Sequence, residues 1–231
     1  MDRKPVVFIP GLLCTGDLFE PQIDYLKPYA DCTLGDHTKH NDIKAIANSI
    51  LENAPSYFCL AGLSMGGYIA LEIMRQAPER VSRLVLMDTS ARPDTDEQNL
   101  KRRQFLKLAT YGKFKGVTRH LLPLLVHPDR LEDADLSETI FQMAEEVGRD
   151  AFIRQQEAIM GRPDSRPGLV KIDCPVMVIV GRQDAITPVS IAEEIVDAIP
   201  QARLEVIENC GHLSTLEQPE VVNQLLLDHF R

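Results

Sequence analysis

The chain has 231 residues, 44% of them hydrophobic and 26% charged, and its formal net charge at pH 7 is -9. This length suits one α/β core and leaves little room for a second, so we expect a single domain over residues 1–231. The negative charge argues against nucleic acid and anionic membranes as partners, and no apolar run approaches the roughly 20 residues that span a bilayer, so we expect a cytoplasmic protein.

Short apolar runs rich in Val, Ile and Leu recur along the chain, and segments of helical periodicity separate them. In chain order, the predicted strands are Val6 to Ile9, Cys32 to Gly35, Ser56 to Ala61, Arg83 to Met87, Val176 to Val180 and Arg203 to Ile207. The predicted helices are Ile43 to Leu51, after a cap at Asn41 or Asp42, then Gly66 to Gln76, Val189 to Ile199 and Pro219 to Phe230. This alternation predicts a doubly wound α/β fold with a mostly parallel sheet of about six strands.

The alternation fails between Ala91 and Asp173. Charged and apolar residues mix there at helical spacing, and no run is typical of a strand. A turn-rich segment, Arg162 to Gly168, then leads back to the strand that follows Cys174-Pro175. We therefore expect a helical insertion at about residues 91–173.

The strand Ser56 to Ala61 leads into Gly62-Leu63-Ser64-Met65-Gly66, a G-x-S-x-G pattern between a strand and a helix. A nucleophile elbow requires that context, because its serine lies on a strained turn that holds the hydroxyl above the sheet. Side chains at Gly62 and Gly66 would collide across so tight a turn. Ser64 is the candidate nucleophile; the alternative is a glycine-rich turn without a catalytic role.

A serine hydroxyl needs a base at neutral pH, and six histidines could supply one. His212 follows the strand Arg203 to Ile207 through a short loop, which places it at the carboxyl end of a strand, where ligands bind in open α/β sheets. His212 is the candidate base. A surface or packing role is the simpler interpretation for His37, His40, His120, His127 and His229.

The acid that orients the imidazole should lie at another strand end, before His212 in the sequence. Asp184 fits, because it comes just past the strand Val176 to Val180. Asp88 directly follows the strand Arg83 to Met87 and is the alternative, although we interpret it chiefly as a loop or helix-capping group. For the oxyanion, Gly11 lets the loop after the first strand approach, so that the backbone N–H groups of Leu12 and Met65 could act together.

Four segments together resemble the α/β-hydrolase superfamily: Pro10-Gly11-Leu12, Gly62 to Gly67, Gly181 to Asp184, and Gly211-His212. The resemblance implies Ser64 as nucleophile, His212 as base, Asp184 as acid, and a helical lid formed by about residues 91–173. The run His212 to Glu220 further resembles 3-oxoadipate enol-lactonases and related small serine carboxylesterases.

Two departures from that superfamily stand out. Members commonly carry a His-Gly pair after the first core strand, whereas this chain has Pro10-Gly11, so a hydrogen bond from that imidazole is lost. The chain also begins almost at this strand, so we expect the usual N-terminal hairpin to be missing. The sheet edge exposed in this way could favour dimerisation, and we expect a monomer or a homodimer.

The leading hypothesis is hydrolysis of a small-molecule carboxylic ester or lactone through an acyl-enzyme, which requires no metal and no organic cofactor. One alternative uses the same triad for carbon–carbon bond hydrolysis, elimination or acyl transfer, and another is a ligand-binding module with negligible turnover. Candidate substrate-binding residues are Leu13, Phe105, Tyr111, Phe114, Leu122, Phe141 and Met160, although many of these could simply pack the lid helices together. Arg162, like Arg119 and Arg154, could bind a substrate carboxylate or could be solvated.

Overall fold

The computed structural model describes residues 3–112 and 114–231. Its six strands form one parallel sheet in the order β2-β1-β3-β4-β5-β6, which confirms the predicted fold class. The strands are β1 (Lys4–Ile9), β2 (Ala30–Leu34), β3 (Phe58–Leu63), β4 (Val81–Met87), β5 (Val176–Gly181) and β6 (Ala202–Ile207). Because all six run the same way, the loops after their carboxyl ends gather at one edge of the sheet.

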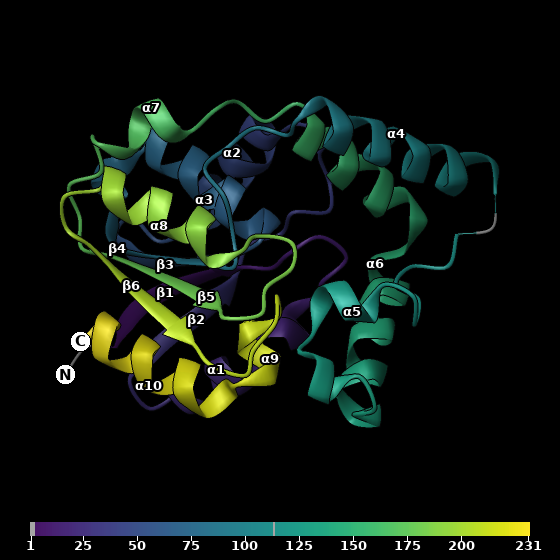
Figure 1. Ribbon diagram of the computed structural model, residues 1–231. Coiled ribbons are helices and arrows are strands. Elements are labelled where there is room, and N and C mark those ends of the chain that lie inside the picture. Colours follow the sequence, from purple (N-terminus) through teal and green to yellow (C-terminus); the bar gives the residue numbers. More distant parts are fainter. Residues whose placement is uncertain (1–2, 113) are drawn as a thin grey trace.

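Helices cover both faces of this sheet (Figure 1). One face packs against α2 (Ile43–Asn53), α3 (Met65–Gln76) and α8 (Val189–Ala198), and the other against α1 (Glu20–Leu26) and α10 (Pro219–Phe230). Alternate residues of β1 pack on opposite faces of the sheet. Val7 and Ile9 belong to the core cluster on the α2, α3 and α8 side, whereas Val6 and Phe8 belong to the second core cluster, on the α1 and α10 side. Buried on both faces, such strands are apolar at every position rather than at alternate ones.

Short helical turns complete the core at its loops. They are η1 (Gly16–Phe19), η2 (Pro78–Arg80) and α9 (Ser214–Glu217). At the start of α2, the Asp42 carboxylate accepts a hydrogen bond from the Ala45 N–H over 2.9 Å, so Asp42 rather than Asn41 is the cap. No helix in the described ranges is long and apolar enough to cross a bilayer.

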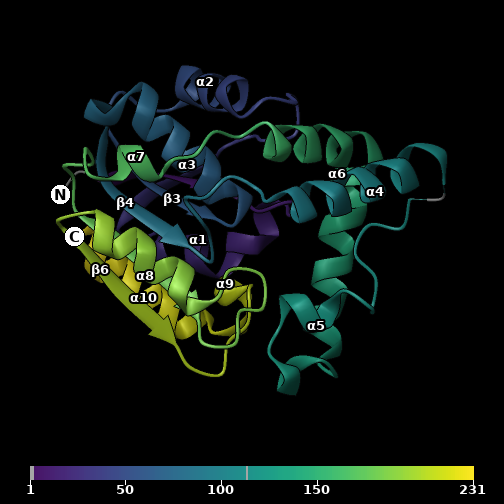
Figure 2. The same cartoon turned by 45° about the horizontal axis from the view of Figure 1, so that its top comes forward.

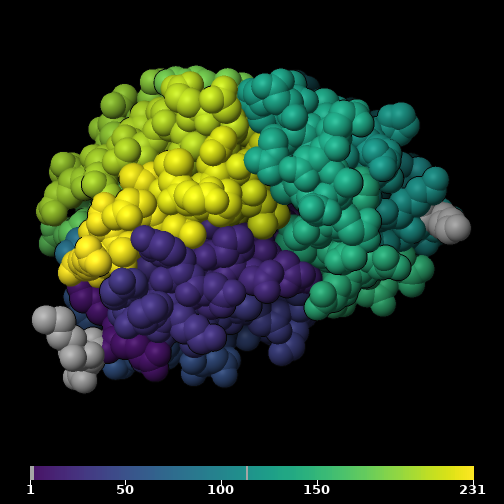
Figure 3. Space-filling model, turned by 90° about the horizontal axis from the view of Figure 1, so that it is seen from below, coloured from purple at the N-terminus to yellow at the C-terminus, as the bar shows by residue number. Residues whose placement is uncertain are grey.

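Between β4 and β5 the described residues form helices and loops but no strand. The helices are α4 (Asp96–Tyr111), α5 (Leu122–Leu125), η3 (Pro128–Arg130), α6 (Ala134–Met160) and α7 (Arg166–Leu169). Gly148, at φ 73°, breaks the long α6. Helices α4, α5 and α6 stand to one side of the sheet (Figure 2), and the teal lobe that contains them abuts the yellow C-terminal segment (Figure 3).

Candidate active site

Ser64 lies on the sharp turn between β3 and α3, with φ 55° and ψ −114°. A side chain in this conformation costs about 1–3 kcal/mol. Glycine makes the turn possible, because a Cβ on Gly62 would lie 2.3 Å from the Gly66 oxygen, and one on Gly66 would lie 1.9 Å from the Ile9 oxygen. The Thr89 hydroxyl donates to the Ser64 carbonyl over 2.7 Å and holds the turn from β4. The Ser64 side chain therefore stands at the start of α3, partly exposed above the sheet.

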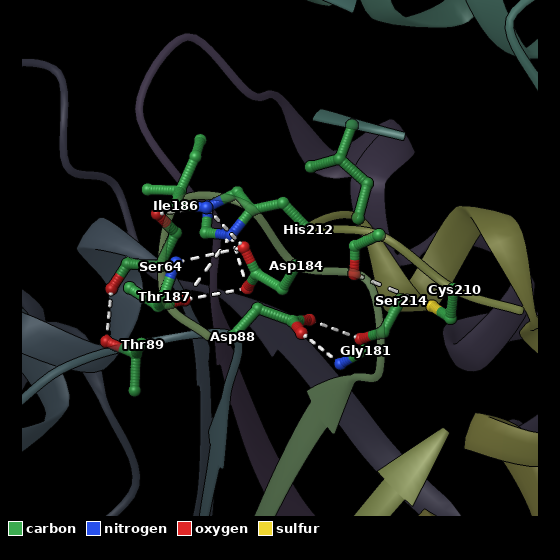
Figure 4. Close-up of polar contacts among 12 residues, drawn as sticks. Ser64, Asp88, Thr89, Gly181, Asp184, Ile186, Thr187, Cys210, His212 and Ser214 are labelled. Carbon is green, nitrogen blue, oxygen red and sulfur yellow. Dashed lines mark hydrogen bonds and ion pairs between the residues drawn. The ribbon is translucent and has the colours of Figure 1, made fainter. Parts of the chain in front are cut away.

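The structure brings Ser64, His212 and Asp184 together from three loops (Figure 4). His212 Nε2 lies 2.9 Å from Ser64 Oγ, and His212 Nδ1 lies 2.8 Å from Asp184 Oδ2. An ionised carboxylate can only accept, so Nδ1 carries the proton and Nε2 is free to accept one from the serine hydroxyl. This arrangement can deprotonate Ser64 as it attacks an electrophile.

The charges around His212 favour its protonated form. Burial lowers the pKa of His212, but the carboxylates of Asp184, Asp88 and Glu217 outweigh burial and raise it above its ordinary value. Burial raises the pKa of Asp184, but the His212 charge and hydrogen bonds from His212 and Thr187 outweigh burial and lower it. The Asp184 carboxylate also accepts from the backbone N–H groups of Ile186 and Thr187. The pair therefore stabilises the imidazolium that forms when His212 takes a proton.

Asp88 lies in the loop directly after β4, as predicted, but in the described chain its carboxylate does not cap a helix. Its carboxylate is fully buried, accepts from the Gly181 N–H over 2.9 Å and contacts the Ser214 hydroxyl, and in Figure 4 it lies beneath Asp184. Burial, with the nearby Asp184 charge, raises the pKa of Asp88 to about 8. Asp88 therefore connects the ends of β4 and β5 to the His212 loop, whereas the carboxylate on His212 Nδ1 belongs to Asp184.

Glu217 is a buried carboxylate that the sequence analysis did not single out. Its Oε1 accepts from the N–H groups of Gly211 and Leu213, on either side of His212, and its Oε2 accepts from the N–H of His127 in the insertion. The His212 N–H donates to the Leu125 carbonyl over 3.0 Å. The histidine loop is thus fixed at three consecutive amides, two by Glu217 and one by the insertion.

The loop after β1 forms a tight turn, closed by a hydrogen bond of 3.1 Å from the Cys14 N–H to the Gly11 carbonyl. Leu13, inside this turn, has φ 60°, and its N–H donates to Gln155 Oε1 from α6 over 3.2 Å. Within the described chain, the N–H groups of Leu12 and Met65 make no hydrogen bond to protein. Both amides are therefore available as donors near Ser64, where the α3 N-terminus adds a partial positive charge.

An open groove of about 990 Å³ lies beside the loop that follows β1. Pro10 and Cys14 from the loop after β1 line this groove, as do α6 residues 146–151 and Arg154. Phe114 also lines this groove, whereas Ser64 and His212 do not. Within residues 3–112 and 114–231 no cluster of histidine, cysteine and acidic side chains could hold a metal ion.

Several residues predicted to bind substrate lie elsewhere. Tyr111 is 87% exposed and Phe105 is 43% exposed on α4, and neither lines this groove. Leu122 and Phe141 pack into the second core cluster, and Leu13 packs against Phe152. Met160, the last residue of α6, is half-buried.

Arg162, a predicted ligand of a substrate carboxylate, is engaged by other residues of the protein. Arg162 Nη1 already pairs with Asp94 Oδ1 over 2.7 Å in a buried ion pair, and its guanidinium stacks 4.2 Å above the Tyr68 ring. Arg119 is exposed. Arg154 lines the groove and donates from Nε to the Thr38 carbonyl, so it remains a candidate.

Comparisons with known proteins fit this architecture. The model of the alpha/beta hydrolase family matches residues 6–225. A Mycobacterium tuberculosis protein that carries the name of a non-heme bromoperoxidase, BpoC, is 30% identical over 74% of this chain and 67% of its own length. A pimeloyl-[acyl-carrier protein] methyl ester esterase of Neisseria meningitidis is 29% identical over 81% of this chain and 61% of its own length.

Among solved structures, a thermophilic esterase from Thermogutta terrifontis with malate bound superimposes with a TM-score of 0.88 at 28% identity, covering 97% of this chain and 88% of that one. The family match extends over nearly the whole sheet and its connecting helices. The strained serine between β3 and α3 lies inside the matched region. This chain belongs to the alpha/beta hydrolase family.

Proposed function

We propose that this protein hydrolyses small carboxylic esters or lactones through an acyl-enzyme, with Ser64 as nucleophile, His212 as base and Asp184 as the acid that orients it. The observation that carries this proposal is the continuous contact from Ser64 Oγ to His212 Nε2 and from His212 Nδ1 to Asp184 Oδ2, at 2.9 and 2.8 Å. Family membership and the esterase names of two similar proteins support it.

The first half of the reaction forms the acyl-enzyme. Ser64 Oγ attacks the carbonyl carbon while its proton passes to His212 Nε2, and the N–H groups of Leu12 and Met65 donate to the oxyanion. The tetrahedral intermediate then collapses, its bond to the leaving oxygen breaks, and that oxygen takes the proton from His212 Nε2 as the alcohol departs. In a lactone the alcohol stays tethered to the acyl group.

The second half repeats these steps with water. A water molecule gives a proton to His212 Nε2 and attacks the acyl carbon, and the same two amides stabilise the oxyanion. Collapse returns the proton to Ser64 Oγ and releases the carboxylic acid. Asp184 remains ionised throughout and holds the Nδ1 proton in place, which keeps Nε2 aimed at Ser64.

The insertion would act as a lid and select substrates, because α6, with Gly112 and Phe114 from the segment after α4, lines the groove that the loop after β1 also lines. In this proposal the groove receives the part of the substrate remote from the scissile bond, with Phe114 against an apolar portion and Arg154 near a substrate carboxylate. Changing Arg154 to Gln should lower kcat/KM for esters of dicarboxylic acids about tenfold more than for neutral esters of equal length. An unchanged ratio would remove the carboxylate part of the proposal.

The decisive experiment is an activity screen of the purified protein over p-nitrophenyl esters, lactones, thioesters and β-diketones, with Ser64→Ala as the control. We expect ester or lactone hydrolysis by the wild type and a loss of at least about a thousandfold in the variant, with an unchanged melting temperature. Labelling of Ser64 by a fluorophosphonate gives an independent readout. Cleavage of β-diketones alone would move the assignment to carbon–carbon bonds, and full activity of Ser64→Ala would refute the proposed function.

A further inference from the structure

His37 lies in the loop between β2 and α2, far from the triad in sequence, yet its ring reaches the loop after β1. Its Nε2 lies 2.9 Å from the Gly11 carbonyl oxygen, and the side chain is buried. A carbonyl oxygen can only accept, so Nε2 carries the proton and donates. Burial lowers the pKa of His37, so the ring is neutral near pH 7 and keeps this donor on one nitrogen.

His37 contacts the peptide whose N–H group is the proposed oxyanion donor. The Gly11 carbonyl and the Leu12 N–H belong to the same planar trans peptide, in which the C=O and N–H bonds point in opposite directions. The carbonyl accepts from His37 Nε2 and from the Cys14 N–H. With the carbonyl held on that side, the Leu12 N–H is turned to the other side.

Gly11 lies beside the candidate nucleophile. A Cβ built on Gly11 would be 3.5 Å from Ser64 Cβ and 3.4 Å from the Leu63 carbonyl oxygen. The orientation of the Gly11–Leu12 peptide therefore decides whether an amide or a carbonyl faces the space next to Ser64 Oγ. A carbonyl in that position would repel an oxyanion instead of stabilising it.

Nothing in the loop itself holds this peptide in place except the turn hydrogen bond. Pro10 precedes it and has no N–H, and Leu13 has φ 60° in a conformation that glycine adopts more readily. The next peptide, Leu12–Leu13, is held from the insertion by Gln155 Oε1. Two side chains from separate parts of the fold thus hold two successive peptides.

We propose that His37 is a positioning residue that fixes the Gly11–Leu12 peptide so that the Leu12 N–H faces the oxyanion formed on the Ser64 adduct. The proposal rests on the proposed function. Pro10 has no imidazole that could contact this loop from the position before Gly11. In this proposal His37, 26 residues after Gly11, supplies the imidazole instead.

The experiment compares His37→Leu, which keeps bulk but has no donor, with His37→Gln, whose side-chain amide can donate near the place of Nε2. The matched control is His40→Leu, because His40 is exposed in the same loop. We expect His37→Leu to lower kcat for a p-nitrophenyl ester about 10- to 100-fold with little change in KM, since losing one oxyanion donor costs about 100- to 1000-fold. His37→Gln should recover most of this loss, and the control should equal the wild type.

A second readout separates positioning from simple structural support. The inhibition constant of a trifluoromethyl ketone, which forms a charged tetrahedral adduct with Ser64, should rise in His37→Leu by about the same factor as kcat/KM falls. Binding of the corresponding alcohol, which forms no adduct, should not change. A purely structural role would lower the melting temperature while leaving kcat and both inhibition constants at their wild-type values, and that result would overturn the proposal.

If His37→Leu does not fold, His37→Asn serves instead, because its shorter amide stops short of the Gly11 carbonyl and should show the same loss relative to His37→Gln. Equal activity of the Asn, Gln and wild-type proteins would refute the role of His37. Ser64→Ala, measured in parallel, separates a failure of the proposed function from a failure of the role of His37. If Ser64→Ala retains turnover, the proposed function fails; if only Ser64→Ala loses turnover, the function stands and the role of His37 fails.

Discussion

At the carboxyl ends of β3, β4 and β5 the backbone itself fixes the side chains of the site, whereas in the insertion side chains hold helices together. Ser64 and Asp88 both have positive φ, at 55° and 45°. Gly62 and Gly66 pack so closely against neighbouring backbone that a Cβ would not fit at either position. On α4, by contrast, Leu108 and Tyr111 are 65% and 87% exposed. We therefore expect the core of the site to tolerate few substitutions and the exposed surface of α4 to tolerate many.

The two regions are nevertheless joined at a few defined contacts. The insertion supplies the Leu125 carbonyl to the His212 N–H, the His127 N–H to Glu217, and Gln155 to the Leu13 N–H. These contacts reach the histidine loop on one side of the site and the β1 loop on the other. The insertion should therefore affect the rate of the chemistry through these contacts and the choice of substrate through the rest of its surface.

The largest effect should come from the acid in the core. Changing Asp184 to Asn removes the charge that holds the Nδ1 proton, and we expect kcat to fall about 10³- to 10⁴-fold for every ester tested. Asp88→Asn keeps an acceptor for the Gly181 N–H and a group next to Ser214, so its kcat should fall less than about tenfold. Steady-state kinetics of both variants decides which carboxylate serves His212, and the reverse ranking would move the acid to β4.

Packing within the insertion should give the next largest effect. Leu122 is 2% exposed and Leu124 is 47% exposed in the same short helix, α5. We expect Leu122→Ala to lower the free energy of unfolding by about 2–5 kcal/mol and Leu124→Ala to change it by less than about 0.5 kcal/mol. Urea unfolding followed by circular dichroism measures both, and equal losses would show that α5 does not pack as described.

Glu217 tests the contact between the insertion and the histidine loop. Glu217→Gln replaces one acceptor oxygen with an NH₂ group, which faces a backbone N–H and cannot accept from it. The loop should then shift His212 relative to Ser64. We expect kcat to fall about 10- to 100-fold, because a displacement of a catalytic group by about 1 Å can lower the rate about 100-fold. The matched control is Glu220→Gln, because Glu220 is exposed three residues further on. A variant with normal kcat would show that the loop holds His212 without this carboxylate.

The same variant has a pH signature. His212 must be neutral to act as a base, so kcat/KM should rise as pH increases through its pKa, with a midpoint above 6.5 because the surrounding carboxylates raise that pKa. Removing the Glu217 charge removes one of these contributions, so the midpoint should move to lower pH in Glu217→Gln. A pH–rate profile at constant ionic strength shows the direction, and a shift to higher pH would contradict the assigned electrostatics.

The smallest effect should come from Gln155 in α6. Gln155→Leu leaves the Leu13 N–H without its acceptor, and because the turn between Gly11 and Cys14 remains, we expect kcat to fall only about three- to tenfold. Gln142→Leu, on the exposed side of the same helix, should have no effect. A loss in Gln155→Leu as large as that in His37→Leu would mean that the insertion, rather than the β2 loop, chiefly positions the β1 loop.

The sequence by itself determined the parts that depend on local backbone rules. Six apolar runs with helical segments between them predict the parallel sheet, and Gly62, Ser64 and Gly66 predict a strained turn because only glycine permits such close backbone approach. His212 follows the last strand, and because the carboxyl ends of parallel strands meet at one edge of the sheet, this position predicts that it lies near Ser64. These signals lie within a few residues or repeat with a fixed period.

Only the tertiary structure decided which distant side chains meet. His37 reaches Gly11 across 26 positions, Ser214 contacts Asp88 across 126, and Leu13 donates to Gln155 across 142. Each of these residues looked locally like a surface, loop or helix residue, because periodicity reports which face is buried and not which partner lies there. The ion pair of Arg162 could not be predicted for the same reason, since its partner Asp94 lies 68 positions earlier in the chain and packing alone joins them.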